Sequence, residues 1–140
     1  MDPRPASQHR ALVVNADPVA RDQYRRVLQN FGCTVQEVAS GVAAVVAARA
    51  ESPVVIVMDM QLPDVPGQEA VEWLKALPGG RETPVITVSW QDRDPALQAS
   101  TAGLVFALSK PVSKRALRQA VSRALGGDGP GVLEDRKRNA

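Results

Sequence analysis

The sequence predicts an α/β fold: a doubly wound, five-stranded parallel sheet with helices on both faces. Five short apolar runs alternate along the chain with segments whose apolar residues recur at helical spacing. Strands that alternate with helices form parallel sheets, because each right-handed crossover carries the chain back across one face. The length of 140 residues suits one domain, and a hydrophobic fraction of 44% is enough to fill its core.

The chain begins with a short aliphatic strand, Ala11–Val14. Asp17 and Pro18 follow as the N-cap and the first residue of a helix, which Gly32 closes. The apolar stripe of this helix consists of Ala20, Tyr24, Val27, Leu28 and Phe31. Cys33–Val38 is expected to be a weaker strand, because its partly alternating pattern is typical of a sheet edge.

The second helix is expected from Ser40 to about Glu51, and it is apolar nearly all round. The run Pro53–Met58 predicts a strand buried on both faces, and Asp59 ends it. Met60–Gly67 follows as a loop with two prolines and a glycine. A carboxylate at the tip of a buried strand is costly to desolvate, which marks Asp59 as a candidate functional residue.

The remaining elements continue the alternation. They are expected at Gln68–Leu77 (helix), Pro84–Val88 (strand), a short helix ending near Thr101, and Leu104–Ser109 (strand). Ser89 follows the fourth strand, and Lys110 with Pro111 follows the fifth. Ser113 caps the final helix, which extends to about Leu125.

The two ends of the chain predict flexible segments around one folded domain at 11–125. Residues 1–10 are polar and lack the apolar segment of a signal peptide. Residues 126–140 are glycine-rich and then highly charged, so we expect a flexible charged tail. No apolar stretch approaches the ~20 residues of a membrane helix. Together with the single cysteine, Cys33, this predicts a cytoplasmic protein without a membrane partner.

The charge balance gives no reason to expect a nucleic-acid partner. The chain carries 17 basic and 15 acidic residues, a net charge of +2. The sequence does not fix the oligomeric state, and a homodimer stays open.

Open parallel sheets bind ligands beyond the carboxyl ends of their strands, at the point where the strand order reverses. We expect the flavodoxin-like order 2-1-3-4-5, in which strands one and three are neighbours. Asn15, Ala16 and Asp17 lie at the tip of the first strand, and Asp59 lies at the tip of the third. The topology alone therefore predicts a site around Asp59.

Three polar residues at strand tips resemble the phosphorylation site of the response-regulator receiver domain of two-component signalling. They are Asp59, Ser89 and Lys110, and the resemblance covers Ala11 to about Leu125. It implies that Asp59 accepts a phosphoryl group from a phosphohistidine on a sensor histidine kinase or phosphotransfer protein. It assigns Ser89 and Lys110 to charge neutralisation around that group.

The resemblance also implies conformational residues and a Mg²⁺ site. Pro63 and Gly67 match residues of the loop after the acceptor, and Pro111 matches the proline after the lysine. The implied metal ligands are Asp59, Asn15, Asp17 and the backbone carbonyl of Gln61. Mg²⁺ prefers hard oxygen ligands, but Ala16 stands where the family has a second acidic ligand. We therefore expect a weakened Mg²⁺ site, with Asp17 also required as the helix N-cap.

Two further departures concern the conformational switch. The aromatic residue that the family places three residues before the lysine is Ala107 here. Phe106 is adjacent, but side chains alternate along a strand, so Phe106 points to the opposite face. Trp90 replaces a small residue beside the acceptor and is expected to restrict access of a kinase histidine or water. The resemblance thus implies a degenerate receiver without an aromatic switch.

Two other functions stay open. A phosphorylation-independent pseudo-receiver would act only as a protein–protein interaction module, which the outward-facing Val42, Val46 and Trp73 favour. A Mg²⁺-dependent phosphohydrolase of the haloacid dehalogenase type needs a second Asp two residues after the nucleophile, where this chain has Gln61. As a receiver the chain is not an enzyme, and it acts on an output protein that the sequence does not name.

Overall fold

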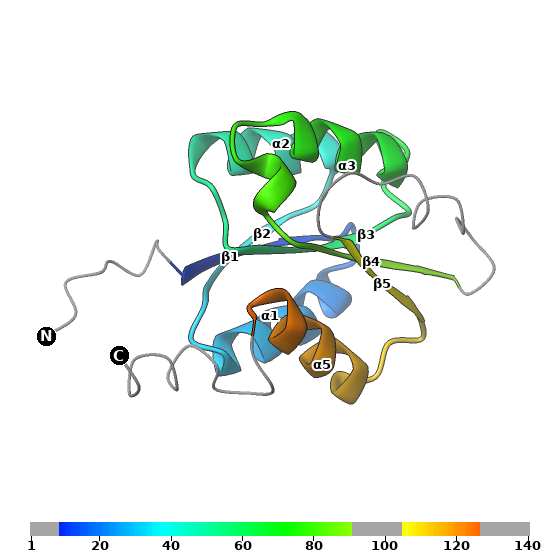
Figure 1. The fold of residues 1–140 in the computed structure, drawn as a ribbon. Helices are drawn as coiled ribbons and strands as arrows, with labels where there is room; N and C mark the ends of the chain where they lie inside the picture. Colours follow the sequence, from blue (N-terminus) through cyan, green and yellow to red (C-terminus); the bar gives the residue numbers. More distant parts are fainter. Residues whose placement is uncertain (1–8, 91–104, 127–140) are drawn as a thin grey trace, which may run out of the picture.

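A computed structural model describes residues 9–90 and 105–126 as a parallel sheet between two layers of helices (Figure 1). The strands are β1 (Arg10–Val14), β2 (Thr34–Val38), β3 (Val55–Asp59), β4 (Val85–Trp90) and β5 (Val105–Lys110). They lie in the order β2-β1-β3-β4-β5, and every neighbouring pair is parallel. The predicted fold class and strand order are confirmed.

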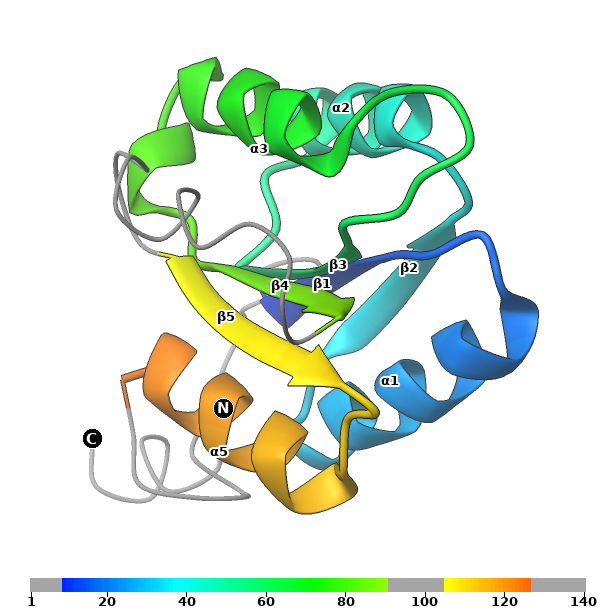
Figure 2. The same ribbon diagram turned by 90° about the vertical axis from the view of Figure 1, so that its right-hand side faces the viewer.

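The helices cover both faces of the sheet. They are α1 (Pro18–Asn30), α2 (Gly41–Ala50), α3 (Gly67–Ala76), the short 3₁₀ helix η2 (Gly80–Glu82) and α5 (Lys114–Ala124). Helices α1 and α5 pack on one face, and α2 and α3 pack on the other (Figures 1 and 2). The predicted short helix ending near Thr101 lies outside the described residues, as do most of the predicted flexible ends.

Side-chain caps begin three of the helices where the sequence placed them. The backbone N–H of Val19 donates to Asp17 Oδ1 (3.0 Å), which caps α1. Ser40 caps α2 by accepting from the N–H of Ala43 (3.1 Å). Ser113 caps α5 by accepting from the N–H of Ala116 (3.0 Å). These bonds satisfy helix N–H groups that have no partner within the helix.

Strand boundaries differ from the predicted ones by one or two residues. The third strand begins at Val55 rather than Pro53, because proline has no N–H to offer a strand ladder. The second begins at Thr34 rather than Cys33, because the N–H of Cys33 donates to the carbonyl of Leu28 at the end of α1. Cys33 is buried, and burial raises the pKa of its thiol to about 11.

Two apolar layers enclose the sheet. The layer under α1 and α5 includes Val13, Val57, Ile86, Val88, Leu117 and Val121. The layer under α2 and α3 includes Leu12, Ile56, Met58, Ala70, Leu74 and Val85. β3 is buried along its whole length, whereas the edge strand β2 is partly exposed. The central position of β3 therefore fixes Asp59 at the middle of the carboxyl edge of the sheet.

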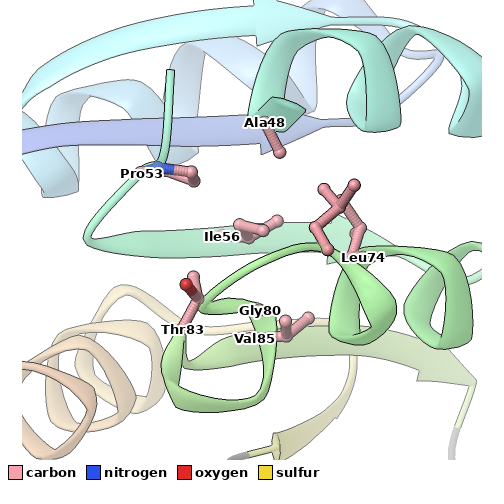
Figure 3. Close-up of a pocket in the computed structure, with 8 residues that line it drawn as sticks. Ala48, Pro53, Ile56, Leu74, Gly80, Thr83 and Val85 are labelled. Carbon is pink, nitrogen blue, oxygen red and sulfur yellow. The ribbon is translucent and has the colours of Figure 1, made fainter. Parts of the chain in front are cut away.

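A small hollow lies in the layer under α2 and α3 (Figure 3). Ala48, Pro53, Ile56, Leu74 and Val85 are among the residues that line it, and its volume is ≈ 10 Å³. That volume is about the minimum for one water molecule, and the lining is apolar. The hollow is therefore a packing defect, too small to bind a ligand.

No helix in the described parts of the chain has both the length and the apolar character needed to cross a bilayer. Exposed large apolar side chains are scattered over the helices and the end of β4. Val42 (51% exposed) and Val46 (63%) point outward from α2, and Trp73 (42%) points outward from α3, as predicted.

Candidate functional site

Asp59 ends β3 and is buried, with 6% of its surface exposed. Lys110 Nζ donates to its Oδ2 at 2.8 Å, and the backbone N–H of Gln61 donates to its Oδ1 at 2.8 Å. A buried carboxylate is stable when a counter-charge and hydrogen bonds replace its water shell. Asp59 therefore has both partners that a desolvated carboxylate requires.

Lys110 is the last residue of β5, and its side chain is 19% exposed. Its Nζ lies 5.5 Å from the centroid of the Trp90 ring. In the ladder between β4 and β5, Trp90 is the register partner of Lys110. The ammonium group thus lies within reach of both the carboxylate of Asp59 and the indole of Trp90. A cis peptide bond joins Lys110 to Pro111.

Ser89 lies on β4, one residue beyond Val88, which is the register partner of Asp59. It pairs across the ladder with Ser109 and is partly buried. The structure therefore brings Ser89 to the same edge of the sheet as Asp59. Its role in charge neutralisation stays a prediction.

Asn15 and Asp17 at the end of β1 have local roles. Asn15 is 3% exposed, and its side-chain oxygen accepts from the N–H of Asp17 (2.8 Å). The Arg21 guanidinium donates to the backbone carbonyl of Asn15 (2.6 Å). Asp17 is exposed, and its Oδ1 caps α1. These two predicted metal ligands thus stabilise the turn between β1 and α1.

These residues fit a Mg²⁺ ion poorly. Magnesium needs several hard oxygen atoms in near-octahedral order, and Ala16 supplies none. Asp59 is the one predicted ligand with a carboxylate buried at the site, and its oxygens already accept from Lys110 and Gln61. Among residues 9–90 and 105–126, no three His, Cys, Asp or Glu side chains come together as a metal-binding group.

The loop after Asp59 requires glycine at its end. A Cβ atom on Gly67 would lie 2.6 Å from both Cα and the carbonyl oxygen of Met60. The N–H of Gly67 also donates to that carbonyl (3.2 Å). Only glycine permits this approach, which gives Gly67 a steric reason for its predicted conformational role. Pro63 is exposed in the same loop.

Asp64 anchors this loop to α2, a contact that the sequence did not reveal. Its two carboxylate oxygens accept from the N–H groups of Gly41 and Val42, each at 2.9 Å. The hydrogen bonds from Val42 and Gly41 lower the pKa of Asp64. No local pattern signals this pair, because 23 residues separate Asp64 from Gly41.

Tyr24 of α1 is a second residue near the site that sequence patterns assigned only to the core. It is 7% exposed and packs in the layer under α1 and α5. Burial raises the pKa of its phenol, and the negative charges of Asp59 and Asp17 raise it further. The phenol therefore lies within the electrostatic field of both carboxylates.

The position predicted for an aromatic switch shows the expected alternation. Phe106 packs against the core under α1 and α5. Ala107 is exposed and lies on the other face of β5. Phe106 therefore does not replace the aromatic side chain that Ala107 lacks.

A buried aspartate paired with a lysine, at the carboxyl edge of a doubly wound parallel sheet, is the arrangement that the resemblance to a receiver domain implies. A model of the response regulator receiver domain family matches residues 11–122. The chain belongs to this family, whose members act in two-component systems.

Two relatives match along most of their length. An uncharacterized 14.6 kDa protein of Leptolyngbya boryana is 30% identical over 113 residues, covering 80% of this chain and 86% of the relative. The polar-differentiation response regulator DivK of Brucella ovis is 28% identical over 116 residues, covering 82% of this chain and 94% of the relative.

Solved structures share the fold of this chain. The receiver domain of a sensor histidine kinase from Pseudomonas aeruginosa, with a magnesium ion coordinated in its active-site cleft, is 28% identical with a TM-score of 0.73. It matches 85% of this chain and 98% of its own. The chemotaxis response regulator CheY4 of Vibrio cholerae, 23% identical, shares the fold with a TM-score of 0.75 over 83% of this chain and 98% of its own.

Proposed function

We propose that Asp59 accepts a phosphoryl group from a phosphohistidine on a sensor histidine kinase or a phosphotransfer protein. The observation that carries this proposal is the ion pair between Asp59 Oδ2 and Lys110 Nζ, 2.8 Å long, at the carboxyl edge of the sheet. The family membership supports it, because receiver domains exchange signals with histidine kinases and output proteins. The domain acts as a phospho-acceptor and not as an enzyme in its own right.

Phosphoryl transfer requires mainly that the protein position the reacting groups and neutralise the negative charge on the transferred group. A carboxylate oxygen of Asp59 attacks phosphorus, the P–N bond to the donor imidazole breaks, and the imidazole nitrogen keeps the electron pair. The donor ring, protonated on its other nitrogen, leaves as neutral imidazole. The product is an acyl phosphate whose phosphoryl oxygens carry the negative charge that the transferred group brought with it. Lys110 lies where it can neutralise that charge, and fixed charges are the main catalytic resource in phosphoryl transfer.

We propose that the metal site is weaker than is usual in the family. This proposal is supported by Ala16, by the Asn15 oxygen that accepts from Asp17, and by the use of Asp17 as a helix cap. The Pseudomonas aeruginosa receiver domain holds a magnesium ion in its cleft. Here we expect binding only at magnesium concentrations well above those that saturate an ordinary receiver.

The test is phosphorylation by a small donor. Wild type and Asp59→Asn are incubated with acetyl phosphate, with and without Mg²⁺, and the bound phosphate is tested for its stability. We expect one acid-stable, base-labile phosphate per wild-type molecule and none on Asp59→Asn. Equal labelling of the two proteins would contradict the assignment of Asp59.

A phosphorylation-independent interaction module is the second candidate. The exposed side chains of Val42 and Val46 on α2 favour it, together with Ala107 in place of an aromatic switch. The interaction module predicts that neither acetyl phosphate nor any of a panel of histidine kinases phosphorylates the protein. The phosphohydrolase alternative is more distant, and a generic phosphatase substrate that stays intact with Mg²⁺ would exclude it.

We infer a cytoplasmic protein whose partners are a kinase or phosphotransfer protein and an output protein. The near-neutral net charge of +2 supports the prediction that nucleic acid is not a partner. Sedimentation of the phosphorylated and unphosphorylated protein tests whether the chain forms a homodimer.

A further inference from the structure

We propose that Trp90 is a positioning residue for Lys110, holding the ammonium group beside Asp59 before and during phosphoryl transfer. This inference rests on the proposed function, because it concerns the same site. It assigns to Trp90 a role beyond that of a bulky obstacle to the donor.

The register of the sheet makes the contact. Trp90 and Lys110 are partners in the ladder between β4 and β5, and partners in a parallel ladder direct their side chains to the same face. The Lys110 Nζ atom lies 5.5 Å from the indole centroid and 2.8 Å from Asp59 Oδ2. A cation within about 6 Å of an aromatic face is attracted by the ring quadrupole.

The position of the ring explains why this attraction is useful. Trp90 is 46% exposed, whereas the side chains of Lys110 and Asp59 are 19% and 8% exposed. The indole therefore lies on the solvent side of a largely buried ion pair. A lysine side chain has four flexible carbon–carbon bonds, and a second attractive surface limits the positions that its ammonium group samples.

The composition of the site increases the importance of this one cation. The residues near Asp59 fit a metal ion poorly, so Lys110 supplies a larger share of the positive charge than in a receiver with a full metal site. An ammonium group already in place needs no reorganisation when the negatively charged phosphoryl group moves to Asp59. Trp90 thus contributes to transfer through Lys110 without contacting the phosphoryl group itself.

Three substitutions separate positioning from obstruction. Trp90→Phe keeps an aromatic face, Trp90→Leu keeps bulk without a ring quadrupole, and Trp90→Ala removes both. Each protein is labelled with acetyl phosphate, and the initial rate is compared with that of wild type. We expect Trp90→Phe to stay near the wild-type rate and both Trp90→Leu and Trp90→Ala to be about fivefold slower. Trp90→Ala labelled as fast as wild type or faster would overturn the proposal and leave Trp90 a steric cover.

A second measurement reports the position of Lys110 without any phosphorylation. The ε-methylene protons of Lys110 should show an upfield ring-current shift in the NMR spectrum of the wild type. The shift should decrease in Trp90→Phe and vanish in Trp90→Leu, and a wild-type shift that persists in Trp90→Leu would overturn the contact. Trp73→Leu is the matched control, because Trp73 is similarly exposed, at 42%, but lies on α3.

The labelling rates and the ring-current shift together distinguish a failure of the proposed function from a failure of the positioning role of Trp90. A wild-type protein that takes no phosphate overturns the proposed function and the effect of Trp90 on transfer, while the ring-current shift still decides whether Trp90 holds Lys110. A protein that is labelled at equal rates in all variants overturns only the positioning role.

Discussion

At the scale of single residues, Asp59 and Lys110 form an ion pair in which each side chain neutralises the charge of the other. Lys110→Ala would leave the buried carboxylate without its counter-charge, so we expect the free energy of unfolding to fall by about 1–3 kcal/mol. Urea denaturation of wild type and variant measures the difference. Lys114→Ala is the control, because Lys114 is an exposed lysine at the start of α5. An unchanged stability would mean that the two side chains do not form the pair in solution.

Ala16 is the residue that most directly limits metal binding. Ala16→Asp would place a charged oxygen where the family has its second acidic ligand, so we expect the dissociation constant for Mg²⁺ to fall at least tenfold, about 1.4 kcal/mol. Titration followed by tryptophan fluorescence or calorimetry measures it, with Ala16→Asn as the control that adds a neutral oxygen. Tight Mg²⁺ binding by the wild type would contradict the weakened site.

Most elements of the fold follow from local patterns that a sequence contains. Helical spacing placed the buried face of α1, where Tyr24, Val27 and Leu28 are all buried. The caps at Ser40 and Ser113 set the starts of α2 and α5, since each cap needs only residues two or three positions away. The strand tips identified Asp59 and Lys110, because topology brings the carboxyl ends of parallel strands together.

Contacts between distant elements were not predictable in the same way. The sequence predicts only that Asp64 lies in a loop, whereas in the folded protein it contacts the first turn of α2. The close approach of the two segments also depends on Gly41, where a Cβ atom would lie 2.4 Å from Val65 Cγ2. Such pairs depend on packing between segments far apart in the chain, which periodicity does not encode.

The Asp64 contact gives the interface between the loop and α2 a pH dependence. The pKa of Asp64 is lowered in the folded protein, so its contribution to stability is present above the unfolded pKa and is lost as the pH falls through the folded pKa. We expect Asp64→Ala to lower the melting temperature at neutral pH and to match wild type in strong acid. Glu72→Gln, an exposed carboxyl on α3, is the control. A melting temperature that is equal at neutral pH would contradict the anchor.

At the scale of the whole molecule, we predict that one route by which a receiver changes its surface is missing. A phosphoryl group shifts a conformational equilibrium only through contacts that differ between the two states. Ala107 stands where the family has an aromatic side chain that moves on phosphorylation. We expect the small side chain of Ala107 to be unable to transmit a movement at the site to the outer face of β5. We therefore expect hydrogen exchange in β5 and α5 to be nearly equal in untreated wild type and in wild type treated with acetyl phosphate. A tenfold difference in exchange between treated and untreated protein would contradict this expectation and indicate an ordinary phospho-switch.

The central claim is that Asp59 accepts the phosphoryl group, and chemical trapping tests it most directly. Protein treated with acetyl phosphate is reduced with borohydride, which converts an aspartyl phosphate to homoserine, and the peptides are sequenced by mass spectrometry. The expected result is homoserine at position 59 of the wild type, with aspartate retained at Asp17 and Asp64 of the same sample. Homoserine at another aspartate, or none at position 59 after full exposure to the donor, would contradict the account.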